Sequence, residues 1–379
     1  MEENSIRKGG ITRRHILGLF GAAALGINFV NTAAAVPVRK LTNGIDISWL
    51  PEVEAAGGKF FTRTRKKIAP LPLMRSANLK VGRLRVWVDP SGANGSLARA
   101  LKLAKRLKAN GMQICVDFHF SDTWADPGNQ SIPSAWSSTS LEDLSTQVHD
   151  YVVETLGEFV RAGCTPQWVQ LGNEISNGTL WPLGQINSND DDQWTRLATL
   201  HASATEAMRS VTPKAKSILH LDCGGDYYKV KWWLEKADQY AIKYDVVGLS
   251  FYPQWHGTLG DLNKVLKHVA VTRQKRVVIA ETAYPWINQT FGNDVINVSH
   301  PSLSGCPYTP SGQWSYVRKL QTMLLALPNN RGIGIWWWEG LSVGVVRNST
   351  VTWNGGMTNS TLVDSAGTAL PALLALGQK

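Results

Sequence analysis

The stretch RLRVWVDPSGANGSLARALKLAKRLKANGMQICVDF, residues 83–118, decides the fold. It opens on an apolar, β-branched run at 83–88. Apolar residues then recur at 97, 100, 101, 104 and 107, spaced three and four apart as on one face of a helix. Asn110-Gly111 ends that pattern, and a second apolar run follows at 112–118. We therefore expect a strand, a helix and another strand over these residues.

The same alternation extends along the chain. Strand-like runs lie at 44–48, 83–88, 112–118, 167–171, 217–222, 244–251, 276–281 and 332–338, with helical patterns near 140–162, 191–210, 228–240, 260–273 and 312–328. Strands that are apolar almost throughout, each followed by a helix, are typical of a parallel sheet covered on its outside. Eight such units predict an α/β protein with a single (β/α)8 TIM barrel. The alternative, a doubly wound open sheet, usually has a Gly-rich phosphate turn after its first strand, and none is present here.

Residues 1–35 have the pattern of an export signal. Arg13-Arg14 precede an apolar run from Ile16 to Val30 that is rich in Gly and Ala, and Ala33-Ala34-Ala35 offers a cleavage site. This favours a cleaved, twin-arginine-like signal over an ordinary secretory signal or an uncleaved anchor. We therefore expect residues 36–379 to form one exported catalytic domain, periplasmic or extracellular, that is monomeric and does not enter the membrane.

Composition narrows the class of partner. Apolar residues make up 43% of the 379 residues and charged residues 18%, which excludes a disordered chain. The net charge of +10 is spread widely, and the basic run at 59–67 lacks the interleaved aromatics of a single-strand-binding surface, so we expect no nucleic-acid partner. The 16 Trp, against 9 Tyr and 9 Phe, indicate a cleft for sugar rings, although some must belong to the core.

Cysteine and histidine spacing gives little support for a metal. The four Cys show no Cys-x-x-Cys pattern, which disfavours a zinc site. We expect no metal and no other cofactor. Cys223 and Cys306 each follow a strand-like run, and the sequence leaves open whether they pair.

Two carboxylates, Glu174 and Glu281, end the fourth and seventh strand-like runs. Such strands lie across the mouth of a barrel from each other, so both carboxylates can flank one bond, as glycoside hydrolysis requires. At the roughly 5–5.5 Å separation of retaining enzymes, Glu281 is the nucleophile and Glu174 the acid/base. We expect Arg85 to keep Glu281 ionised, and apolar surroundings with a negative neighbour to raise the pKa of Glu174. A structural ion pair is the alternative for either carboxylate.

Further polar and aromatic residues follow the strand ends, where barrel enzymes carry their sites. Asn173 precedes the acid/base and could bond a sugar 2-hydroxyl, whereas His119 could equally be a hydrogen-bonded core histidine. The candidate lining residues are Arg85, Trp87, His119, Asp122, Trp124, Asn173, Tyr252, Trp255, His256 and Trp338. Glu339 follows a Trp triplet and could instead form a salt bridge at the rim.

Longer motifs resemble the arabinogalactan endo-β-1,4-galactanases of glycoside hydrolase family 53, from about Asn43 to Leu376. The most specific are HFSDTWADPG at 119–128 and YPQWHG at 252–257, supported by LGNE at 171–174 and ETAYP at 281–285. The resemblance implies hydrolysis of β-1,4-galactan, the side chain of type I arabinogalactan and pectin, with net retention. It implies Glu174 as acid/base and Glu281 as nucleophile.

The resemblance also implies roles for the lining residues and exposes some departures. Its subsite for the cleaved sugar would comprise Arg85, His119, Asn173, Tyr252 and Trp338, and its walls would be Trp87, Asp122, Trp124 and Trp255. Phe120 stands where the family usually has Tyr, and Gly340 follows Glu339 where it tends to have Pro. The short segment 287–310 leaves open a calcium ion near 291–300. The alternatives are a related barrel enzyme acting on mannan or cellulose, and a non-catalytic glycan-binding barrel.

Overall fold

The structure is a computed structural model, and it describes residues 40–136, 140–347 and 350–377. The export signal predicted at 1–35 lies outside these ranges. Within them, every helix is too short or too polar to span a bilayer.

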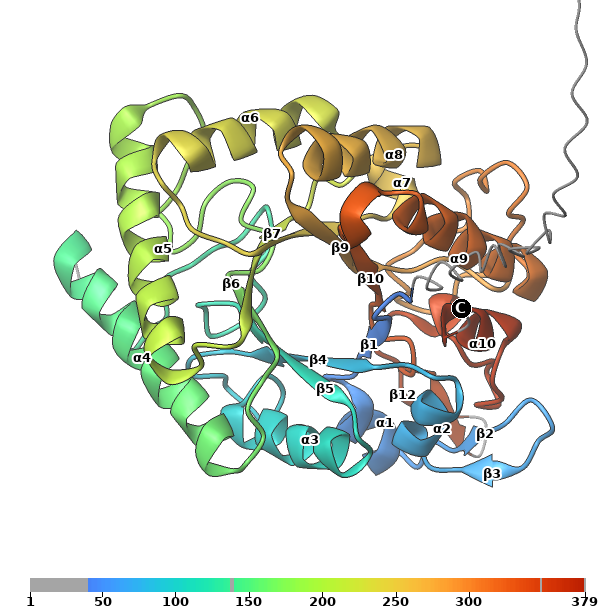
Figure 1. The fold of residues 1–379 in the computed structure, drawn as a ribbon. Helices are drawn as coiled ribbons and strands as arrows, with labels where there is room; N and C mark the ends of the chain where they lie inside the picture. Colours follow the sequence, from blue (N-terminus) through green and yellow to red (C-terminus); the bar gives the residue numbers. More distant parts are fainter. Residues whose placement is uncertain (1–39, 137–139, 348–349, 378–379) are drawn as a thin grey trace, which may run out of the picture. The chain divides into compact units, whose positions relative to one another are not determined.

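Eight parallel strands close into a barrel (Figure 1). They are β1 (Gly44–Asp46), β4 (Val81–Val86), β5 (Gln113–Phe118), β6 (Trp168–Leu171), β7 (Lys216–Leu221), β8 (Val246–Ser250), β9 (Arg276–Thr282) and β10 (Gly332–Trp337). Strand β1 pairs with both β4 and β10, which completes the ring. Each of the eight predicted strands overlaps one of these, so the predicted TIM barrel is confirmed.

Helices cover the outside of the ring (Figure 1). The predicted ones are α3 (Leu97–Ala109), α4 (Leu141–Arg161), α5 (Asp191–Val211), α6 (Tyr227–Gln239), α8 (Leu259–Lys267), which continues as the π-turn η1 (His268–Thr272), and α9 (Pro310–Leu325). A polar side chain caps the first turn of each helix by accepting a backbone N–H; the caps are Ser96, Ser140, Asp190, Asp226, Thr258 and Thr309. These caps fix where each helix starts, just beyond the mouth of the barrel.

Several short elements were not predicted. They are α1 (Leu50–Ala55), α2 (Pro70–Ser76), α7 (Pro253–His256), α10 (Pro371–Gly377), the turns η2 (Pro328–Asn330) and η3 (Thr358–Ser360), and the hairpins of β2 (Phe60–Phe61) with β3 (Lys67–Ile68) and β11 (Val345–Arg347) with β12 (Thr350–Trp353). Each is too short to give a recognisable hydrophobic period.

The barrel interior has an apolar floor and a polar layer above it. The floor is a separate cluster of buried side chains: Val81, Cys115, Trp168, Ile218, Val246, Val278, Ala280, Ile333 and Trp336. Residues two positions further along a strand face the same interior. On β4, β5, β6 and β7 these are Arg83, Asp117, Gln170 and His220, all buried. The polar layer therefore lies directly beneath the carboxyl ends of the strands, where a barrel carries its site.

Candidate active site

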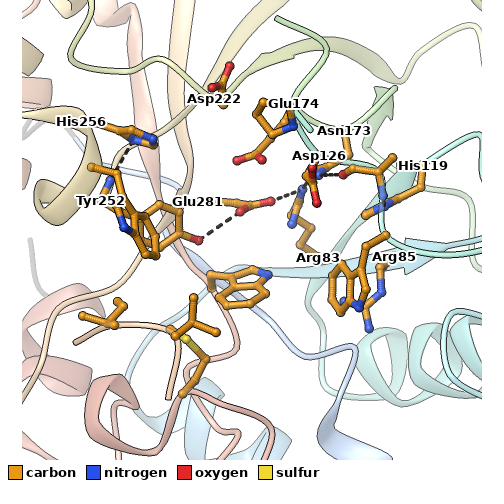
Figure 2. A pocket seen from close by; sticks show the side chains of 18 residues that line it. Arg83, Arg85, His119, Asp126, Asn173, Glu174, Asp222, Tyr252, His256 and Glu281 are labelled. Atoms are coloured by element: carbon orange, nitrogen blue, oxygen red, sulfur yellow. Dashed lines mark hydrogen bonds and ion pairs between the residues drawn. The ribbon is translucent and has the colours of Figure 1, made fainter. Parts of the chain in front are cut away.

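A cavity of about 380 Å³ opens at the carboxyl ends of the barrel strands (Figure 2). Ten of the twelve predicted site residues line it: Arg85, His119, Trp124, Asn173, Glu174, Tyr252, Trp255, His256, Glu281 and Trp338. The strand ends of a closed barrel converge, so side chains as far apart in the sequence as Arg85 and Trp338 share this space.

The two predicted catalytic carboxylates point toward each other across the cavity (Figure 2). A carboxylate oxygen of Glu174 lies within 4.8 Å of one of Glu281. Retaining glycosidases hold their two carboxyl groups roughly 5–5.5 Å apart, whereas inverting enzymes need roughly 6.5–9.5 Å to admit a water. The spacing here therefore suits direct attack by one carboxylate on the sugar.

Local backbone irregularities turn both carboxylates inward. On β9, Val278 and Ala280 face the barrel interior, and strict alternation would turn the next residue outward. A register shift after Leu249, which pairs Ser250 with Glu281, lets Glu281 face the interior as well. At the end of β6, Gly172 (φ 96°) and Glu174 (φ 50°) adopt left-handed conformations that carry the chain over the barrel mouth.

Arg83, rather than Arg85, holds the nucleophile. Its guanidinium lies 2.8 Å from Glu281, and it also contacts Asp46 and Asp117, each at 2.9 Å. The prediction that Arg85 performs this role is wrong, because both arginines face the interior and alternation cannot distinguish them. Arg85 lies 3.8 Å from the buried Glu339, with its guanidinium 4.0 Å from the ring centroid of Trp124.

Burial and neighbouring charges shift the pKa values of the two carboxyl groups differently. Burial raises the pKa of Glu281 to about 7, against the opposing effect of Arg83. Burial raises the pKa of Glu174 well above its ordinary value, and the adjacent Glu281 raises it further. Arg83 thus favours ionisation of Glu281, whereas the adjacent carboxylate favours the protonated form of Glu174. Such a division suits a nucleophile and a general acid.

Tryptophan side chains form one wall of the cavity. Trp338 and Trp124 line it, with ring centroids 6.2 Å apart, and Trp49 packs behind both at 5.5 and 5.7 Å. Glu339 accepts the backbone N–H of Trp49 and the hydroxyl of Ser342. It is completely buried, so the salt bridge considered for it, which it forms with Arg85 at 3.8 Å, lies in the interior and not at the rim. The wall offers flat apolar faces of the kind that pack against the C–H face of a sugar.

Comparison with known proteins agrees with this geometry. The model of the family described as "Glycosyl hydrolase family 53" matches residues 42–376. This chain belongs to glycosyl hydrolase family 53. An arabinogalactan endo-beta-1,4-galactanase of Thermothelomyces thermophilus is 33% identical over 300 residues, covering 76% of this chain and 86% of its own. A probable arabinogalactan endo-beta-1,4-galactanase A of Aspergillus fumigatus is 35% identical, covering 78% and 83%.

Solved structures extend the comparison. The GH53 catalytic domain of Ignisphaera aggregans superposes with a TM-score of 0.80 at 29% identity, covering 90% of this chain and 97% of its own. The GH10 protein of Paenibacillus barcinonensis shares the fold, with a TM-score of 0.56 at 14% identity over 89% of this chain and 94% of its own. The family 53 hydrolase is therefore similar in both sequence and structure to known members.

Two predicted lining residues lie outside the cavity of this family 53 hydrolase. Trp87 is buried, and its ring packs edge-on against that of Trp124, with centroids 5.4 Å apart. The carboxylate of Asp122 accepts backbone N–H groups from Asp89 and Ser134, at 3.0 and 2.7 Å, and so ties two loops together. Neither residue is among those that line this cavity, and their contact with substrate stays a prediction.

Three predicted lining residues have side chains already held by the protein. His119 bonds Asp117 through Nε2 at 3.1 Å and accepts the backbone N–H of Ala125 through Nδ1 at 3.0 Å. Asn173 accepts from Arg83 and donates to the backbone oxygen of Ala125. His256 accepts the backbone N–H of Tyr252 through Nδ1, at 3.1 Å (Figure 2). His119 therefore presents its ring to the cavity, with both nitrogens in use.

The sequence reasoning also missed several residues of the family 53 site. Asp126, Pro127, Asp222, Val295, Ile296 and Met357 line the cavity, and Arg83 lies at its base. Asp222 could have been found, because it lies two positions beyond His220 and four beyond Ile218 on an inward-facing row. Val295, Ile296 and Met357 come from irregular loops, whose approach to the cavity leaves no periodic signal.

The segment considered for calcium is held by the protein itself. Asp294 accepts three backbone N–H groups, from Phe291, Thr358 and Asn359, at 2.7 to 3.1 Å. Its carboxylate thus fastens the loop after β9 to η3. The question left open for the cysteines is answered by the same structure, in which all four are buried and free.

Tyr252 provides a first test of the site. Its hydroxyl donates to Oε2 of Glu281 at 3.0 Å, which stabilises the ionised carboxylate. For Tyr252→Phe we expect kcat/KM to fall roughly 10- to 100-fold, the loss expected for one hydrogen bond to a charged group. The pKa of Glu281 should also rise, moving the acid limb of the pH–rate profile to higher pH. A kinetic profile from pH 4 to 9 measures both, and an unshifted acid limb would contradict this role of the hydroxyl.

Proposed function

We propose that this chain cleaves internal β-1,4-galactosidic bonds of type I arabinogalactan and pectic galactan, with retention of anomeric configuration. The observation that carries the proposal is the pair of carboxylate oxygens within 4.8 Å of each other in a Trp-walled cavity. Membership of glycosyl hydrolase family 53 supports the reaction class. The galactan substrate is supported by curated relatives that are named for it.

The reaction proceeds in two steps. Glu281 attacks the anomeric carbon while Glu174 transfers its proton to the glycosidic oxygen, so the C–O bond breaks and the leaving chain departs as an alcohol. The sugar is then bound to Glu281 as an ester. In the second step Glu174, now a carboxylate, removes a proton from water, which displaces Glu281 and restores both groups. Two inversions at the same carbon give net retention.

Charged neighbours explain how the resting protonation state is held. Burial raises the pKa of Glu281 to about 7, and Arg83, at 2.8 Å, opposes that rise and so favours the ionised nucleophile. Glu174 has Glu281 and Asp222 as negative neighbours, which keep its carboxyl protonated. Once Glu281 is esterified its charge disappears, so the pKa of Glu174 falls and the group becomes ready to act as a base.

Incubation with linear β-1,4-galactan tests the proposal directly. We expect galacto-oligosaccharides of several lengths early in the reaction, and ¹H NMR should show the β-anomer first, followed by mutarotation. Mannan, cellulose and arabinose-decorated galactan serve as parallel substrates. Activity on mannan or cellulose without activity on galactan would place the chain elsewhere among the barrel hydrolases. Binding to galactan without new reducing ends would favour a glycan-binding barrel.

We also propose that the enzyme acts outside the cytoplasm. The support is the Arg13-Arg14 pair, the apolar run and the small-residue site within residues 1–35. A polysaccharide substrate is consistent with export, since a long galactan chain does not cross a bilayer.

A further inference from the structure

We propose that Ser250 and His220 form a positioning relay for the acid/base, one that holds Oε1 of Glu174 as an acceptor and leaves Oε2 to carry the catalytic proton. This inference rests on the proposed function, because it concerns the same acid/base. Neither residue lines the cavity, so neither reaches the substrate. Both act through Glu174.

The relay is a closed circuit of hydrogen bonds. Ser250, the last residue of β8, lies with Oγ 2.5 Å from Oε1 of Glu174. His220 on β7 lies with Nε2 3.0 Å from the same Oγ. The other ring nitrogen, Nδ1, faces the backbone N–H of Glu174 at 3.3 Å. Ser250 and His220 are completely buried, so water does not compete for these contacts.

Surrounding donors fix the direction of every proton in the circuit. The backbone N–H of Glu174 can only donate, so it requires a lone pair on Nδ1 of His220. The amide nitrogen of Gln170 lies 3.0 Å from Nδ1, and because one of its two protons goes to Asp117, a single proton remains for Nδ1 of His220 or Oδ1 of Asn173. One acceptor, Oδ1 of Asn173, competes at 3.0 Å, but it already accepts a proton from Arg83 at 2.9 Å. The backbone N–H of Glu174 cannot accept a proton, so its contact with Nδ1 leaves that nitrogen without one.

The bare Nδ1 determines the remaining protons. A neutral histidine with no proton on Nδ1 carries it on Nε2, so His220 donates to Oγ of Ser250. Ser250 has only one hydroxyl proton, and with its oxygen accepting from His220 it donates that proton to Oε1 of Glu174. The acidic proton of Glu174 then belongs on Oε2. Rotation of the carboxyl group would break the circuit, so the proton is held in one place.

The hydrogen bond from Ser250 also affects the pKa of Glu174, in opposition to its negatively charged neighbours. Burial, Glu281 and Asp222 raise its pKa, whereas the Ser250 hydroxyl and Arg83 lower it. The titratable group on the adjoining strand β7 is His220, which burial and Arg83 keep neutral by lowering its pKa. The Ser250 bond is therefore the one neutral contribution that can be removed without altering a charge.

Ser250→Ala tests the relay, with Ser250→Thr as the conservative variant. For the alanine variant we expect kcat/KM on galactan to fall about 10-fold, with most of the loss in kcat. Its alkaline limb should move to higher pH, since loss of the donor raises the pKa of Glu174. Ser250→Thr keeps the hydroxyl and should recover most of the rate and the original limb. Ser217→Ala, which removes a buried hydroxyl bonded to Asp245 on the same sheet, should leave both unchanged.

A leaving-group comparison separates positioning of the acid from a structural effect. The dinitrophenolate group of a dinitrophenyl β-galactobioside leaves without being protonated. The kcat/KM for this substrate should therefore fall less than about 3-fold in Ser250→Ala. An equal loss on both substrates, or an alkaline limb that stays or moves to lower pH, would overturn the relay. Wild-type enzyme that fails on galactan but cleaves the aryl substrate would instead overturn the proposed substrate. The two failures are therefore distinguishable.

Discussion

Glu281→Ala abolishes hydrolysis of galactan, with kcat reduced by at least about 10⁴-fold, because the ester intermediate can no longer form. The protein should remain folded. Arg83 keeps Asp46 and Asp117 as partners after the change, so no cation is left buried and unpaired. A retained fold with lost turnover is the signature of a residue that acts only in the reaction.

The stability of the Glu281→Ala variant should depend on pH in a defined way. Burial raises the pKa of Glu281 to about 7 in the folded protein, above its value in the unfolded chain. The folded state then binds more protons than the unfolded state between those values, so this group destabilises the wild type as pH rises toward 7. Removing it should leave Tm equal or higher at pH 7, with a smaller effect at pH 4.

Chemical rescue identifies the role of the lost group. Azide should enter the space left by Glu281 and attack the sugar from the same face, giving an α-galactosyl azide from an activated β-galactoside. Glu158→Ala, which removes an exposed carboxylate paired with Arg161, is the matched control and should retain wild-type kcat. Residual galactan hydrolysis above about 1% of wild type would contradict a covalent role for Glu281.

The barrel was predictable because its signals are long and periodic. Each strand is a short apolar run between amphipathic helices, and Glu174 and Glu281 end two such runs on opposite sides of the ring. The strand-end rule therefore found the catalytic pair without knowledge of any contact. The bulge that turns Glu281 inward could not be predicted, because it is a property of strand register.

Some residues have roles that depend on how far a side chain extends or on the course of a loop. These roles could not be predicted from the sequence. Arg83 and Arg85 share one inward-facing row, and only the contacts decide which guanidinium meets Glu281. Asp122 lies in a motif shared with the family, yet its carboxylate accepts hydrogen bonds from backbone N–H groups. Ser250 and His220 carry no motif, although alternation from the floor residues places both inside the barrel. The sequence pattern predicts on which face of the sheet a side chain lies, whereas its function depends on the hydrogen bonds that it makes.

Arg83→Met should cost both activity and stability. The guanidinium lies among Asp46, Asp117 and Glu281, and its loss leaves three buried carboxylates without their shared cation. Removing one partner of a buried ion pair typically costs about 3–5 kcal/mol of unfolding free energy. We expect a loss in that range at pH 7, measured by urea unfolding, and a fall in kcat/KM of about 10³-fold because Glu281 no longer ionises readily.

The pH dependence of that loss distinguishes charge from packing. Burial alone would raise the pKa of Asp117, but Arg83 and His119 outweigh it and lower the pKa to about 2. In the wild type this group contributes stability above its unfolded pKa and loses it as pH falls toward 2. Without Arg83 the pKa of Asp117 rises above the unfolded value, so acidification should stabilise the variant, and the deficit should shrink between pH 7 and 5.

Two further arginine variants complete the test. Arg83→Lys keeps the charge but loses the planar fork, so it should recover part of the stability and little of the activity. Arg85→Met removes a cation whose carboxylate partner, Glu339, is 3.8 Å away and still has the hydroxyl of Ser342 as a donor, so its cost should be smaller. If Arg83→Met and Arg85→Met lose equal stability at every pH, packing explains the deficit. The polar layer would then contribute packing alone, and the charge of Arg83 would not promote ionisation of Glu281.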